Sequence, residues 1–146
     1  MSVRKGEPVV MVVDDERDFL TLTKTVLQSA GYRVDARTRA PSWRNLHATD
    51  PALILMDVVL DGENGSDVCR AIKTHKHLHV LPVILISGHG EDRLRKEMEL
   101  CKADGFLTKP ISRALLLQLA KHYVARHKHG GRLNGSSVVP PIPIAK

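Results

Sequence analysis

The chain has 146 residues, enough for one compact domain and too few for two. Apolar residues make up 42% and aromatic residues only 3%, so an aliphatic core is expected. The apolar runs are far shorter than the roughly 18 residues that span a membrane, and the polar start MSVRKGEP is not a secretory signal. Cys69 and Cys101 lie in helical patterns without a CxxC motif, which favours buried thiols in a cytoplasmic protein over a disulfide.

The net charge is +6, and the basic residues concentrate in the C-terminal third. All 16 acids lie at or before Asp104, whereas residues 105–146 hold seven Lys and Arg residues and no acid. Such a segment could attract nucleic acid or an acidic partner. No interleaved aromatics, helix-turn-helix or zinc pattern accompanies it, so nucleic acid is not expected as a partner and a solvated face is favoured.

Apolar runs and helical periodicities alternate through the first half of the chain. A continuous apolar run ends in two aspartates, a second one ends at Asp57, and Gly31 stands where a helix would close. The expected elements are a strand at Val9–Val13, a helix over residues 19–30, a strand at Tyr32–Ala36, a brief helix opened by Pro41, and a strand at Ala52–Met56. Trp43 and Phe19 are interpreted as packing residues.

The same alternation continues through the second half. The expected elements are a loop at Asp61–Gly65, a helix at Ser66–Lys73, a strand at Val80–Ile86, a helix marked by Leu94, Met98 and Cys101, a strand at Gly105–Thr108, and a helix over residues 111–123. Five strands alternating with five helices predict a parallel sheet covered on both faces. Residues 1–128 form this domain, and residues 129–146 are a disordered, basic Gly/Ser/Pro-rich tail or a stretch of non-native sequence.

Polar side chains follow four of these strands. Asp14 and Asp15, Asp57, Ser87 and Lys109 come directly after strand ends, and the carboxyl ends of parallel strands meet at one edge. Three carboxylates close together repel one another and favour a hard divalent cation such as Mg²⁺. A carboxylate can also attack phosphorus and form an aspartyl phosphate, whose charge a metal and an ammonium would offset.

These motifs carry a family resemblance. Val-Asp14-Asp15-Glu, Leu-Met-Asp57, Ile-Ser87-Gly88 and Lys109-Pro110 resemble the receiver domains of two-component response regulators, the CheY-like family, over residues 8–128. The resemblance implies a flavodoxin-like (βα)5 fold, a doubly wound parallel sheet with strand order 2-1-3-4-5.

The resemblance also implies roles for the residues at the strand ends. Asp57 would be the phosphoacceptor. Asp15 and Asp57 would bind Mg²⁺ directly together with the backbone carbonyl of Val59, and Asp14 would act largely through water. Lys109 would pair with the phosphate.

Further roles concern switching and hydrolysis. The hydroxyl of Ser87 would move to bond the phosphate, and the aromatic side chain of Phe106 would follow it. Val59 and His89 occupy the positions that tune hydrolysis of the phosphate. Asp61 stands where the family commonly has proline, which adds negative charge near the metal.

The expected function is therefore a phosphoacceptor switch, not an enzyme, with at most slow autodephosphorylation. Phosphorylation would change the face built from the fourth helix, fifth strand and fifth helix. A sensor histidine kinase or phosphotransfer protein would act upstream and an unknown effector protein downstream, and a phosphorylation-dependent homodimer is a weaker hypothesis that rests on three adjacent leucines, Leu115–Leu117.

Two alternatives stay open. The chain could be a receiver module excised from a larger regulator or hybrid kinase. It could instead be a phosphohydrolase with an aspartyl intermediate, but such an enzyme needs a second acid two residues after the nucleophile, where Val59 stands. No DNA-binding output domain follows residue 128.

Overall fold

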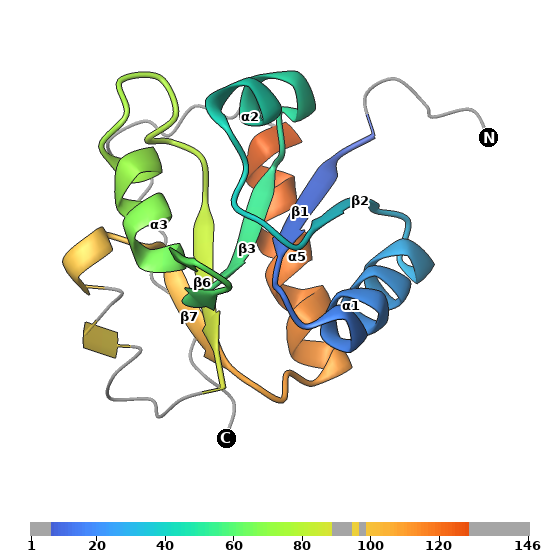
Figure 1. Ribbon diagram of the computed structural model, residues 1–146. Helices are drawn as coiled ribbons and strands as arrows, with labels where there is room; N and C mark the ends of the chain where they lie inside the picture. Colours follow the sequence, from blue (N-terminus) through green and yellow to red (C-terminus); the bar gives the residue numbers. More distant parts are fainter. Residues whose placement is uncertain (1–6, 89–94, 97–98, 129–146) are drawn as a thin grey trace.

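A five-stranded parallel sheet forms the centre of the molecule (Figure 1). The computed structural model describes residues 7–88, 95, 96 and 99–128. The strands are β1 Val9–Val13, β2 Arg33–Arg37, β3 Leu53–Asp57, β6 Val83–Ser87 and β7 Gly105–Thr108. They lie in the order β2-β1-β3-β6-β7, all pairs parallel, which confirms the expected order 2-1-3-4-5.

Four helices have defined bounds, and they cover the sheet on both faces. They are α1 Arg17–Ser29, α2 Trp43–Thr49, α3 Gly65–Lys73 and α5 Arg113–Lys128. Residues 95, 96 and 99–101 are also helical, where the fourth helix was expected, but Leu94 and Met98 lie outside the described residues. No helix in the described part of the chain is long and apolar enough to cross a membrane.

Two segments differ from the sequence-based expectation. The strand expected at Val80–Ile86 begins at Val83, because residues 75–81 form turns in which His79 N–H donates to the His75 carbonyl and Leu81 N–H to the Leu78 carbonyl. The expected loop at Asp61–Gly65 is largely a small antiparallel hairpin, in which β4 Val59–Leu60 pairs with β5 Glu63–Asn64. Its turn is closed by Gly62, whose φ of +75° suits glycine.

Alternation along the strands divides the core into two layers. Val10 and Val12 of β1 join the cluster under α1 and α5, which includes Tyr123. Met11 and Val13 point the other way and join the cluster under α2 and α3. Figure 1 shows α1 and α3 on opposite sides of the sheet. Burial on both faces is the reason why these strands are continuous apolar runs in the sequence.

The two cysteines lie in the cluster under α2 and α3. Both are free and buried, as expected. A hydrogen bond with the neighbouring Cys101 thiol and burial together raise the pKa of Cys69 far above its ordinary value. The Cys69 thiol also donates to the Cys101 carbonyl at 3.8 Å, so both groups are satisfied within the core.

Two interpretations of apolar side chains need correction. Trp43 was interpreted as a packing residue, but it is exposed on α2, where its ring contacts His75 at the surface rather than the core. Leu115–Leu117 were expected to leave one leucine exposed, but Leu116 is buried and its two neighbours pack partly buried against the core. The leucines therefore give no support to a homodimer.

Candidate functional site

The carboxyl edge of the sheet gathers the polar residues that the sequence places after strand ends. Asp14 and Asp15 follow β1, Asp57 closes β3, Ser87 closes β6, and Lys109 follows β7. Parallel pairing aligns these strand ends, because Asp57 stands opposite Ile86 and Ser87 opposite Thr108 in the ladders.

Three carboxylates meet at this edge. Ligand oxygens of Asp14, Asp15 and Asp57 all lie within 4.8 Å of one another, in the one such group found among the described residues. Asp14 and Asp57 are buried and Asp15 is exposed, so the group has an inner side and an open side. This donor set, hard oxygens with one side open to water, fits a divalent cation such as Mg²⁺.

Backbone amides orient the two buried carboxylates. Oδ1 of Asp14 accepts from the Glu16 N–H at 2.8 Å, and Oδ1 of Asp57 accepts from the Val59 N–H at 3.0 Å. The N-cap of α1 is Glu16, and no side chain caps this helix, so Asp14 is not a helix cap. Each carboxylate thus has one oxygen held by a turn and a second oxygen turned to the cluster.

The ammonium of Lys109 lies among the acids. Its Nζ is 2.8 Å from Oδ2 of Asp14, 3.1 Å from Oε1 of Glu16 and 3.5 Å from Oδ2 of Asp57. It also lies 4.4 Å from the centre of the Phe19 ring. Burial lowers the pKa of Lys109, but hydrogen bonds with Asp14 and Glu16 and the charges of Asp14 and Asp57 outweigh burial and raise the pKa above its ordinary value.

Glu16 and Phe19 were not among the residues predicted for the site. Glu16 directly follows the two aspartates in the sequence, and this adjacency was its only signal. Phe19 lies one helical turn further and packs partly buried against the core as expected, while its ring also faces the ammonium. The peptide bond between Lys109 and Pro110 is cis, and the Lys109 N–H donates to the Ser87 carbonyl.

The surroundings of Asp57 raise the pKa of its carboxyl to about 6. Burial and the charge of Asp14 raise this pKa, whereas the hydrogen bond from the Val59 N–H and the charge of Lys109 lower it. One ammonium therefore does not fully compensate the acids around it. Oδ2 of Asp14 makes no hydrogen bond of good geometry beyond its ion pair with Lys109. A further cation would relieve this excess of negative charge.

The two predicted switch residues are both buried. Ser87 is buried at the end of β6. Phe106 is buried in the cluster under α2 and α3, with the Arg95 guanidinium 5.1 Å from its ring centre. Val59 is exposed on β4, and His89 lies outside the described residues.

Gly65 is a further residue that the sequence interpretation did not single out. A Cβ at this position would overlap the backbone carbonyl of Asp57. The Gly65 N–H donates to the Val58 carbonyl at 2.7 Å, which holds α3 against the end of β3. The absence of a side chain therefore allows α3 to start beside the cluster.

Comparison with known proteins agrees with this geometry. Residues 10–121 match the family model described as "Response regulator receiver domain". The transcriptional regulatory protein GltR of Pseudomonas aeruginosa is 30% identical over 118 residues, which are 80% of this chain and 49% of GltR. The sensor histidine kinase GacS of Pseudomonas protegens is 31% identical over 116 residues, 77% of this chain and 13% of GacS.

The fold also matches solved structures. A putative response regulator from Chloroflexus aurantiacus superposes with a TM-score of 0.73 at 24% identity, covering 82% of this chain and 99% of that one. The present chain spans about half the length of GltR. The family model, in contrast, covers most of the chain, and the fold agrees with it. This protein belongs to the response regulator receiver domain family of two-component systems.

Proposed function

We propose that the chain is a phosphoacceptor switch of a His-to-Asp phosphorelay, in which Asp57 takes the phosphoryl group with Mg²⁺ bound beside it. The observation that carries the proposal is the position of Asp57. It closes the central strand β3 within the three-carboxylate group, its Oδ2 lies 3.5 Å from the Lys109 ammonium, and its pKa is raised to about 6. Receiver domains are signalling switches rather than enzymes, and this chain is expected to have at most slow autodephosphorylation.

The chemistry follows from the two oxygens of Asp57. Oδ1 is held by the Val59 N–H, whereas Oδ2 faces the Lys109 ammonium. Oδ2 attacks the phosphorus of the donor, the new O–P bond forms, and the bond from phosphorus to the donor imidazole breaks, with its electron pair returning to the imidazole. The ammonium of Lys109 offsets negative charge on the transferring oxygens.

The metal would be held by Asp14, Asp15 and Asp57, with the Val59 carbonyl as a further ligand. When bound, it would offset charge on the phosphoryl oxygens and reduce repulsion among the carboxylates. Val59 has no side-chain group that could hydrogen-bond an attacking water, whereas the imidazole of His89 has one, and the residues at these two positions would set the lifetime of the phosphate.

The readout would follow from Ser87 and Phe106. The Ser87 hydroxyl would donate a hydrogen bond to the phosphate and Phe106 would move with it. The face formed by the helical residues 95, 96 and 99–101 together with β7 and α5 would then change its affinity for a partner. The expected partners are a sensor histidine kinase or phosphotransfer protein upstream and an effector protein downstream. The matches to GacS and GltR support a place for this module in a larger regulator or hybrid kinase as an alternative setting.

The test is phosphorylation of the full chain by acetyl phosphate, or its reaction with beryllofluoride, with and without Mg²⁺. Intact mass should show one added phosphoryl group only when Mg²⁺ is present, and amide NMR shifts should centre on the carboxyl edge. Asp57→Asn should abolish both signals, whereas Asp61→Asn, an exposed acid on the nearby hairpin, should retain them. An undiminished signal in Asp57→Asn, or equal phosphorylation without Mg²⁺, would contradict the proposal.

A further inference from the structure

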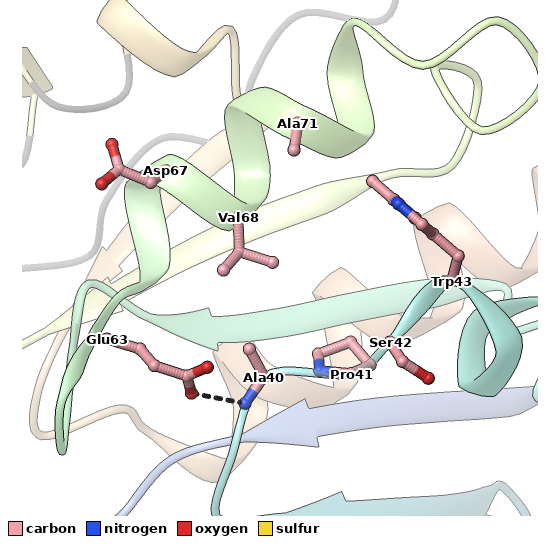
Figure 2. Close-up of a pocket in the computed structure, with 8 residues that line it drawn as sticks. All are labelled: Ala40, Pro41, Ser42, Trp43, Glu63, Asp67, Val68 and Ala71. Atoms are coloured by element: carbon pink, nitrogen blue, oxygen red, sulfur yellow. Dashed lines mark hydrogen bonds between the residues drawn. The ribbon is translucent and has the colours of Figure 1, made fainter.

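A groove runs between α3 and the segment that leads into α2, away from the carboxylate cluster. Its volume is about 530 Å³. Figure 2 shows Val68 and Ala71 pointing from α3 towards Ala40 and Pro41, which form the opposite wall. The groove is open to solvent, with apolar side chains along its length and polar ones at its ends, a lining that can accept an extended peptide.

Trp43 stands at one end of this groove. It is the single tryptophan of the chain, and 49% of it is exposed. One side of the ring packs on His75, with 4.9 Å between ring centres. Ser42 caps α2 in a capping box with Asn45, which holds Trp43 in place at the first helical position. A half-exposed tryptophan beside apolar side chains is typical of a binding site.

Two carboxylates stand at the other end. Figure 2 shows Glu63 and Asp67 on the side opposite Trp43. Oε2 of Glu63 accepts from the Ala40 N–H at 3.1 Å and so ties the groove wall to the hairpin. Neither carboxylate takes part in an ion pair within the described part of the chain. The groove thus offers an aromatic surface at one end and negative charge at the other.

One segment of the chain has the complementary chemistry. Residues 138–146, VVPPIPIAK, combine three prolines with four aliphatic Val and Ile residues and end in Lys146. Their composition favours a polyproline II conformation, which aromatic-lined grooves bind at low entropic cost. Residues 129–146 contain no Asp or Glu side chain and carry the cationic side chains of Arg132 and Lys146, so their side-chain charge is opposite to that of the groove carboxylates.

The connection is long enough for binding within one chain. Because α5 follows β7 and runs antiparallel to the strands, it ends with Lys128 at the amino edge of the sheet, the edge at which α3 also ends. Residues 129–137, HGGRLNGSS, reach up to ~30 Å when extended, about twice the radius of gyration of a domain of this size. The stretch of α3 from Asp67 to Lys73 rises only ~9 Å, which three polyproline II residues match.

We propose that residues 138–146 of the same chain dock in this groove between α3 and the segment that leads into α2. The prolines would lie against Trp43, and the Lys146 side chain would lie near Glu63 and Asp67. This site is separate from the phosphoacceptor site and does not depend on the proposed function. Tethering by nine residues gives a local concentration in the millimolar range, so a weak contact suffices for occupancy.

Fluorescence of Trp43 in the full chain tests the proposal, because no other tryptophan contributes. Ile142→Glu in the docked stretch should release the segment, and Leu133→Glu in the connection is the matched control. Acrylamide quenching should rise about twofold in Ile142→Glu, because a ring that is 49% exposed without the segment is largely covered with it. Leu133→Glu should quench like the parent chain.

Variants in the groove complete the test. Ala71→Glu places charge on the apolar wall and should raise quenching as much as Ile142→Glu, whereas Ala48→Glu, on an exposed face of α2 outside the groove, should not. Circular dichroism verifies that all variants remain folded. Unchanged quenching in Ile142→Glu or in Ala71→Glu would overturn the proposal. Protection that disappears on dilution would also overturn it, since the segment would then occupy the groove of a second copy.

Discussion

Replacement of the acceptor carboxylate by an amide should stabilise the metal-free protein. Asp57→Asn keeps the oxygen that accepts from the Val59 N–H and removes the charge that burial and Asp14 disfavour. It also removes the attraction to Lys109, but this attraction already lowers the pKa of Asp57, which is nevertheless raised. The net effect of the charge on folding is therefore unfavourable at neutral pH.

The magnitude follows from the pKa of Asp57. A rise from 3.8 in the unfolded chain to about 6 in the folded one corresponds to at most ~3 kcal/mol, at about 1.4 kcal/mol per pH unit. Because Asp57 and Asp14 interact, part of this free energy belongs to the pair rather than to Asp57 alone. We therefore expect Asp57→Asn to raise the free energy of unfolding by about 1–3 kcal/mol. The unfolded chain loses the proton at lower pH than the folded one. Stability from this group is thus lost as pH rises from near 3.8 to about 6.

Urea unfolding in EDTA, followed by circular dichroism, measures this effect. Near pH 7.5 Asp57→Asn should have the higher free energy of unfolding, and near pH 4 the two proteins should differ little. Mg²⁺ at ten times its Kd should stabilise the parent by ~1.4 kcal/mol and Asp57→Asn much less. The difference between their free energies of unfolding should therefore become smaller when Mg²⁺ is added. Asp61→Asn, an exposed acid on the same edge, is the control and should change stability by less than ~0.5 kcal/mol.

Two results would refute the reasoning. If Asp57→Asn is no more stable than the parent near pH 7.5 without metal, the carboxylates are not in electrostatic conflict. If the gain is equally large near pH 4, its cause is packing rather than ionisation of Asp57.

Three further changes test the packing around the site. Lys73→Ala should lower the free energy of unfolding by about 2 kcal/mol, because the half-buried Lys73 ammonium donates to the Leu81 carbonyl and to the Asp104 carboxylate. Lys76 is exposed, so Lys76→Ala should have little effect in the same urea titration. Gly65→Ala should lower the free energy of unfolding by more than about 3 kcal/mol or prevent folding, because a Cβ there overlaps a backbone carbonyl. Gly62→Ala, at a position with positive φ and open space, should lower it by only about 1 kcal/mol. Equal losses in the two variants would contradict the overlap at Gly65. The Cys69 thiol should resist alkylation at neutral pH until the protein unfolds, because burial and the adjacent thiol raise its pKa; rapid labelling of the native protein would show that the core is open.

Much of the fold was accessible from local patterns. Strands buried on both faces must be apolar throughout, so Val9–Val13 and Gly105–Thr108 match β1 and β7 at both ends. Helix ends were less accurate, because capping depends on single hydrogen bonds such as that of Asn64 to the Ser66 N–H. The hairpin of β4 and β5 was missed, since strands of two residues have no periodicity.

The carboxylate cluster shows how far local reasoning extends. Strand ends meet at one edge of any parallel sheet, so Asp14, Asp57 and Lys109 could be brought together before the structure was known. The sequence could not show that Glu16 and Phe19 also surround the Lys109 ammonium. These contacts depend on the angle at which α1 leaves β1, which is set by packing against the whole sheet.

The sequence by itself therefore determined the elements, their alternation and the edge at which the reactive groups gather, because burial and chain direction follow from local pattern. The tertiary structure alone decided how strongly those groups interact. Burial of Asp57, its distance from Asp14 and the single nearby ammonium set its pKa, and these depend on side chains that are distant in the sequence. The exposed position of Trp43 beside His75 was likewise a matter of tertiary packing, which its own apolar character does not predict.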